Sequence, residues 1–414
     1  MSIKKFVGLN EALDLTFANI PLMGIEKLPL EKLSGKILAE DIISEVDSPS
    51  TDCSLRDGYA VFSDDLEKAD LNNPVKLKVI GDATAGNRSD KSVSRGNTIK
   101  ITTGAPLPEG ANAVLSEEFS RQAKDEVYCY NDARAGRNVL KRGTDNAKGE
   151  VVVERGTRLS PPIIGLIASA GLDSAVVYRS PRVAVIATGD EVVAPGHHLP
   201  DGKLYASNMV AICAWLSSND ISFTTEVARD NTDDIMAAIK KYLNKVDAFI
   251  TSGGAWGSER DLILKVLEDL GWGCLYNRVR IGPGKAISFG LLEGFPFFCL
   301  PGGPPSNEMA FLQLTLPGLL RMKGDSQCLF PLVWARLTET VWGQIDWTQF
   351  IHANIVGRER NIFIIKPLKE GSRLKSMAWK DVLITIPEGC ETIKKGEETL
   401  VQLLNSLCLY KGNY

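Results

Sequence analysis

Between residues 188 and 306, short polar and glycine-rich segments interrupt apolar runs at regular intervals. Glycines let backbone N–H groups approach phosphate oxygens, a lysine adds positive charge, and carboxylates bind Mg²⁺. The residues concerned are Thr188, Gly189, Asp190, Glu191, Asp230, Ser252, Gly253, Gly254, Ser258, Asp261, Lys285, Gly302, Gly303 and Ser306. Together they predict a site for a phosphate-bearing ligand and a divalent cation.

The segment "ITSGGAWGSERDLI" (250–263) shows how such a site is built. An apolar run is followed by a glycine pair and then by residues at helical spacing, so the free N–H groups of a helix N-terminus face the loop. These groups and the helix dipole favour an anion. Ser258 and Asp261 also fit the spacing of a capping box, which gives Asp261 a purely structural alternative.

The other charged residues have equally plain alternatives. Glu191 and Asp230 fit the description of solvated loop carboxylates, and Lys285 fits that of an ordinary surface lysine. Taken one at a time, the residue types leave both readings open.

Strand-like and helix-like segments alternate from residue 182 to residue 322. This pattern predicts a mostly parallel sheet with helices on both faces, and ligands of such sheets bind beyond the C-terminal ends of the strands. A helix is expected to have Ser207 or Asn208 as its N-cap, and another helix is expected after Asn231, which has Asp234 at capping distance. The polar segments fall where the strands end.

The rest of the chain favours β-structure. Short alternating runs predict an inserted β-rich domain over 47–141 and a small closed or sandwiched β domain, barrel-like, over 326–414. Residues 1–46 and 142–180 form a helical and extended N-terminal segment, and 181–325 form the α/β domain. The expected fold class is therefore α/β with additional β domains.

Composition excludes several classes of function. The 414 residues carry a formal charge of -4, which argues against a nucleic-acid partner. With three histidines and no C-x-x-C among eight cysteines, neither a zinc site nor a disulfide framework is indicated. No apolar stretch reaches the roughly 20 residues of a membrane span, and the amphipathic start is unlike a signal peptide, so we expect a cytoplasmic protein without membrane partners.

Seven short segments follow one another along the chain: "DGYAV" (57–61), "TTGAPLPEGANAV" (102–114), "ATGDE" (187–191), "SNMV" (207–210), "TSGG" (251–254), "GPGK" (282–285) and "LPGGPPS" (300–306). These segments and their order resemble those of the molybdopterin molybdenumtransferases, the molybdenum insertases that include the C-terminal domain of gephyrin. The chain resembles this family over nearly its whole length. The resemblance implies a homodimer whose active cleft is shared between the α/β domain of one subunit and the inserted domain of the other.

The resemblance also implies a reaction and a set of site residues. Family members insert molybdate, or tungstate, into adenylylated molybdopterin with Mg²⁺ and release AMP. Positions matching catalytic ones are Asp57, Glu191, Asp261 and Lys285, and the cation would be held by Glu191, Asp230 and Asp261. Positions matching substrate-binding ones are Thr103, Thr188, Gly189, Ser252, Gly253, Gly254, Ser258, Gly302, Ser306 and Ser372.

Departures from the family pattern fall inside the same loops. Gly282 replaces the first lysine of K-P-G-K, Gly303 replaces the asparagine of P-G-N-P, Gln349 stands where an arginine is usual, and Trp256 follows the glycine pair. These changes remove positive charge and an amide from the expected site. A second hypothesis therefore stands beside the insertase: a paralogue that binds molybdopterin nucleotide or a protein partner as a carrier or scaffold.

Overall fold

The computed structural model describes residues 4–253, 262–368 and 373–404. The chain separates into two compact units, one formed by Met1–Glu26 with Tyr178–Tyr414 and the other by Lys27–Val177. The four-part division predicted from the sequence stays a prediction, since the described contacts define these two units. No helix in the described part of the chain would span a bilayer.

A seven-stranded sheet organises the larger unit, in the order β1-β19-β21-β22-β18-β14-β17. Its neighbours pair in parallel except for the β19–β21 and β21–β22 pairs, as predicted for a mostly parallel sheet. The strands are β1 (Lys4–Val7), β14 (Arg182–Thr188), β17 (Ser222–Ala228), β18 (Ala248–Ser252), β19 (Gly273–Val279), β21 (Ser288–Leu292) and β22 (Phe295–Leu300).

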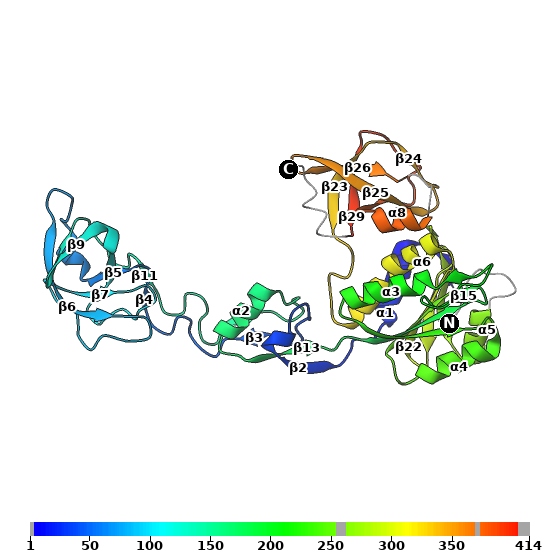
Figure 1. Ribbon diagram of the computed structural model, residues 1–414, viewed down its shortest axis with the longest axis horizontal. Coiled ribbons are helices and arrows are strands. Elements are labelled where there is room, and N and C mark those ends of the chain that lie inside the picture. The colour runs from blue at the N-terminus through cyan, green and yellow to red at the C-terminus, as the bar shows by residue number, and fades with distance from the viewer. Residues whose placement is uncertain (1–3, 254–261, 369–372, 405–414) are drawn as a thin grey trace. The chain divides into compact units, whose positions relative to one another are not determined.

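Both faces of this sheet are buried under helices. Val183 and Val185 of β14 belong to one apolar core and Ala184 and Ile186 to a second, because successive side chains of a strand point to opposite faces. The first core is covered by α1 (Leu9–Asn19), α3 (Ser207–Ser218), α6 (Pro304–Ala310) and α7 (Leu316–Met322). The second is covered by α4 (Thr232–Tyr242) and α5 (Leu262–Asp269), which lie together in Figure 1.

The expected helix starts are partly confirmed. Asn231 caps α4, and its side chain accepts a hydrogen bond from the Asp234 N–H at 2.9 Å. The expectation for α3 was wrong, because its N-cap is Ala206 and Asn208 already lies inside the helix. The Asn208 side chain instead donates a hydrogen bond to the carbonyl oxygen of Gly302, so its amide connects α3 to a loop and does not cap the helix.

The C-terminal strands form a closed barrel, which decides between the two β architectures expected there. The ring runs β25-β26-β23-β29-β27, and β27 pairs back to β25. Its strands are β23 (Leu332–Leu337), β25 (Thr348–Glu359), β26 (Ile362–Pro367), β27 (Val382–Ile386) and β29 (Glu398–Leu403). The short strand β20 (Ile281–Gly282), directly after β19, pairs with β25 and so joins the α/β sheet to the barrel. Helix α8 (Arg373–Trp379) lies beside the barrel strands.

The smaller unit contains a six-stranded sheet with an apolar core on each face, and a further core elsewhere. The strand order of the sheet is β8-β5-β7-β6-β10-β9, and Tyr59 and Ala60 belong to the cores on its opposite faces. Its strands are β5 (Gly58–Val61), β6 (Val75–Ala83), β7 (Asn97–Ile101), β8 (Ala113–Ser116), β9 (Ser120–Ala123) and β10 (Glu126–Cys129). The further core packs α2 (Pro161–Ser169) against β3 (Ile42–Ile43), β12 (Val151–Val153) and β13 (Ser174–Tyr178).

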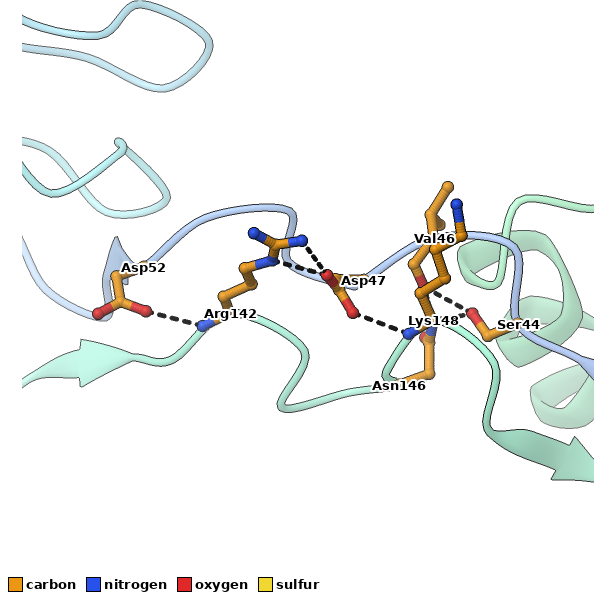
Figure 2. Close-up of polar contacts among 7 residues, drawn as sticks. All are labelled: Ser44, Val46, Asp47, Asp52, Arg142, Asn146 and Lys148. Atoms are coloured by element: carbon orange, nitrogen blue, oxygen red, sulfur yellow. Dashed lines mark hydrogen bonds and ion pairs between the residues drawn. The ribbon is translucent and has the colours of Figure 1, made fainter.

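Polar contacts brace the two chain segments, 44–52 and 141–150, that connect the six-stranded sheet to this further core (Figure 2). The Asp47 carboxylate accepts hydrogen bonds from Nε of Arg142 at 2.6 Å and from the backbone N–H of Lys148 at 2.7 Å. Asp52 accepts the backbone N–H of Arg142, and Asn146 donates to Oγ of Ser44. Carboxylates and amides, not apolar side chains, therefore hold this connection in register.

Candidate functional site

A cavity of about 850 Å³ opens at the C-terminal ends of β14, β18 and β22. It lies where the sequence predicts a ligand site, because the ends of parallel strands share one edge of the sheet. Five of the predicted residues line it: Thr188, Glu191, Ser252, Gly253 and Gly302. Gly254, Ser258, Asp261 and Ser372 lie outside the described residues.

Gly253 brings the ends of β14 and β18 into contact. Its φ is 112°, and a Cβ atom there would lie 2.3 Å from the carbonyl oxygen of Thr188, so only glycine fits. Thr188 is buried, and its Oγ1 finds no hydrogen-bond partner within the described residues. Because a buried hydroxyl without a partner is costly, this atom has hydrogen-bonding capacity left for a polar group that enters the cavity.

Two side-chain amides fix the neighbouring loop. Asn307 donates to Oγ of Ser252 at 3.0 Å and to the carbonyl oxygen of Pro301 at 2.9 Å, and Asn208 donates to Gly302. The loop of residues 301–303 is thereby tied to β18 and α3. The "SNMV" segment contained Asn208, but nothing in the spacing of Asn307 indicated its role.

Carboxylates gather beside the cavity. Glu191 lines it, and its side chain folds over Gly189, where a Cβ atom would meet Oε2 of Glu191 at 2.7 Å. Asp190 accepts a hydrogen bond from the backbone N–H of Asp230. Burial raises the pKa of Asp230, and the negative charges of Asp190 and Glu191 raise it further. A place where carboxylates repel one another is a place where a cation is favoured.

Carboxylate oxygens are ligands that Mg²⁺ prefers, but the described residues supply too few of them at one point to define a metal site. Among the described residues, no three His, Cys, Asp or Glu side chains converge as metal ligands. Glu191 and Asp230 belong to the predicted set, whose third member, Asp261, lies outside the described residues. The metal assignment accordingly stays a prediction.

Lys285 and Ser306 line a different cavity, of about 590 Å³, together with Gly282, Gly303 and Gln349. The sequence had grouped these residues with the first cavity in one site. The loop 301–306 contributes to both, since Gly302 lines the first and Gly303 the second. One continuous motif therefore serves two neighbouring cavities.

Aromatic rings orient Lys285. Its Nζ lies 5.0 Å from the ring centre of Phe6 and 5.2 Å from that of Trp347, which are themselves arranged edge to face. Ring faces attract cations, so this pair restricts an otherwise exposed ammonium group. Phe6 comes from β1 and Trp347 precedes β25, two positions that no local pattern in the sequence connects.

Asp57 and Thr103 lie in the smaller unit and form a pair of their own. Oδ1 of Asp57 accepts the Thr103 backbone N–H at 2.6 Å and the Thr103 hydroxyl at 2.9 Å. These two hydrogen bonds hold the pKa of Asp57 below its usual range. Asp57 is thus a fixed, ionised carboxylate at neutral pH, which suits a residue that orients a bound group.

Two family descriptions match the chain: "MoeA N-terminal region (domain I and II)" over residues 7–171, and "Probable molybdopterin binding domain" over residues 184–321. The chain is 31% identical over 391 residues to the molybdopterin molybdenumtransferase of Haemophilus influenzae, covering 92% of this chain and 94% of that protein. It is 30% identical to the protein of that name from Bacillus subtilis, covering 92% and 90%. A solved molybdopterin biosynthesis MoeA protein from Pyrococcus horikoshii OT3 matches with a TM-score of 0.83 at 29% identity, over 96% of this chain and 100% of that one.

Proposed function

Because the chain belongs to the molybdopterin molybdenumtransferase family, a family of transferases in molybdenum cofactor biosynthesis, we propose that it inserts molybdate, or tungstate, into adenylylated molybdopterin and releases AMP. The observation that carries the proposal is the first cavity. It joins a buried Thr188 hydroxyl that has no hydrogen-bond partner among the described residues, backbone at Gly253 and Gly302, and the carboxylate of Glu191. Such a lining suits a phosphate-bearing ligand with an associated cation.

In this proposal, each group has a defined task. Glu191 and Asp230 would hold Mg²⁺, which would neutralise charge on the phosphoanhydride that is cleaved. Thr188 and the glycine backbone at Gly253 donate to ligand oxygens. Lys285, oriented by its two rings, supplies positive charge in the second cavity, where it would bind the metal oxyanion.

The proposed working form is a cytoplasmic homodimer. Asp57 and Thr103 lie on an exposed surface of the smaller unit, and neither of them lines the first or the second cavity. The fixed carboxylate of Asp57 would complete the cleft of the other subunit by orienting water or substrate.

One observation favours the carrier alternative. Gly282 and Gln349 form an uncharged part of the wall of the second cavity. A protein that only binds its ligand requires less positive charge in this wall than a transferase does. Retention of Glu191, Asp230 and Lys285 favours the transferase, because these groups serve chemistry more than binding.

The test is AMP release from adenylylated molybdopterin by the purified protein with Mg²⁺, in the presence and absence of molybdate or tungstate. The proposal predicts AMP release that depends on the oxyanion and is lost in a Glu191→Gln variant. Binding of the ligand with no AMP under any oxyanion would reject the transferase and leave the carrier.

A further inference from the structure

The first cavity has only two charged side chains among its described lining residues, Glu191 and Arg373. The lysine that the sequence assigned to an anionic ligand, Lys285, lines the second cavity instead. A ligand with a phosphate group in the first cavity therefore has one side-chain cation to meet it within the described part of the chain. That cation is the first residue of α8.

We propose that Arg373 binds the terminal phosphate of molybdopterin and that the buried Lys380–Glu308 ion pair positions Arg373. This inference rests on the proposed function. The Arg373 side chain is exposed, and the described residues offer its guanidinium no carboxylate within ion-pair distance. A guanidinium presents several N–H donors in one plane and matches two phosphate oxygens at once. Among the described residues, nothing therefore competes with a ligand for this charge.

A buried ion pair fixes α8 to the helix that borders the cavity. Nζ of Lys380, just after α8, lies 2.6 Å from Oε1 of Glu308 on α6 and donates to the carbonyl oxygen of Met377 at 2.8 Å. The side chains of Lys380 and Glu308 are only 4% and 11% exposed. Breaking one partner of such a pair is costly, so the contact holds α8 against α6.

His352 on the barrel strand β25 completes the junction. Its Nε2 lies 3.5 Å from Oε2 of Glu308, whereas Lys380 contacts the other carboxylate oxygen, Oε1. Helix α6 also supplies Pro304 to the cavity wall. The same helix therefore borders the ligand and anchors the helix that carries Arg373, which ties the position of the guanidinium to the cavity.

The decisive experiment compares molybdopterin with the same pterin after enzymatic removal of its terminal phosphate, titrated anaerobically by pterin fluorescence. The wild-type protein is expected to bind the phosphorylated form more tightly. Arg373→Gln is expected to weaken that binding about tenfold or more and to leave binding of the dephosphorylated form unchanged. Arg360→Gln, which removes a charge from an exposed barrel turn, is the matched control and should bind like the wild type.

The outcomes separate this inference from the function on which it rests. If the wild type binds neither form, the proposed function fails, and this inference with it. If the wild type prefers the phosphorylated form and Arg373→Gln retains that preference, the inference alone is overturned.

The positioning part has its own readout. The double variant Lys380→Met with Glu308→Gln removes both buried charges and should lose phosphate preference to the same degree as Arg373→Gln. Adding Arg373→Gln to it should change nothing further, because both act through one contact. Additive losses would overturn the positioning role. If the double variant does not fold, a Lys380→Arg variant is tested in its place. Its preference for the phosphorylated form should lie between those of the wild type and Arg373→Gln. An unchanged preference would count against the positioning role of the ion pair.

Discussion

Gly282 and Gln349 are register partners in the parallel pair of β20 and β25, and a Cβ atom at position 282 would lie 3.0 Å from Nε2 of Gln349. Two residues that depart from the family pattern thus meet in one wall of the second cavity. Their proximity makes them one coupled feature, in which the missing side chain at 282 provides room for the amide at 349. The charge of this wall is set by both positions together.

This coupling predicts the outcome of a double-mutant cycle. Gly282→Ala should destabilise the protein by about 1 kcal/mol through crowding, and by less than half of that in a Gln349→Ala background. Urea denaturation of the four proteins measures both values. Equal costs in the two backgrounds would show that Gln349 is not the residue that limits position 282.

Gly253→Ala should be among the most damaging single changes in the cavity. A side chain there combines a φ of 112° with a backbone oxygen 2.3 Å away, so we expect a loss of about 2 kcal/mol or more in unfolding free energy. Gly302→Ala is the matched control, because its Cβ atom would meet its nearest neighbour at an ordinary 3.7 Å. Similar losses in both variants would contradict the steric account.

Glu191→Gln should separate intrinsic stability from stability conferred by Mg²⁺. Because the pKa of Asp230 is raised in the folded protein, the free energy of unfolding falls as the pH rises from below 3.8 through this raised pKa. The resulting loss of stability persists at neutral pH. Removing one of the repelling charges should reduce this deficit and raise Tm slightly in the absence of metal. The wild type should gain about 2.7 kcal/mol at a Mg²⁺ concentration a hundredfold above Kd, and the variant less. Melting curves with and without Mg²⁺ test both effects.

Thr103→Val should raise the pKa of Asp57 only part of the way to its usual value. The larger contribution, the backbone N–H of residue 103, survives the substitution, while the hydroxyl hydrogen bond is lost. A carboxyl ¹³C NMR titration reads this directly. A pKa that does not move would show that the hydroxyl contributes nothing in solution.

Asp47→Asn should loosen the connection between the six-stranded sheet and the further core of the smaller unit. The variant loses the ion pair with Arg142, and we expect several-fold faster proteolytic cleavage within 141–150 with an unchanged main melting transition. The hydrogen bonds from Lys148 and Arg142 lower the pKa of Asp47, so protection in the wild type should persist at pH values below 3.8. Glu67→Gln, an exposed change in the same unit, serves as the control.

The strands and helices of the α/β domain, and the edge of the sheet where the first cavity opens, were predictable from the sequence. The contacts between side chains that are far apart in the sequence were not. Alternation of apolar runs predicts β14, β18 and their helices, and strand direction then predicts where Thr188, Ser252 and Gly253 meet. Long-range packing decides the rest. Phe6 reaches Lys285 only through the pairing of β1 with β19, and Arg373 reaches the first cavity only through the anchoring of α8. No local spacing encodes such contacts, so the sequence assigned the cation of the first cavity to Lys285.

The pairing of β1 with β19 also bears on how the protein is made. Val7 pairs with Val279, and Lys4 pairs with Tyr276, so each residue of β1 leaves the ribosome long before its partner in β19. The edge of the sheet, and with it the ring of Phe6 beside Lys285, can form only after β19 has been synthesised. During translation, β1 must therefore wait without its partner, and the second cavity can be completed only after Trp347 and Gln349 have also been added.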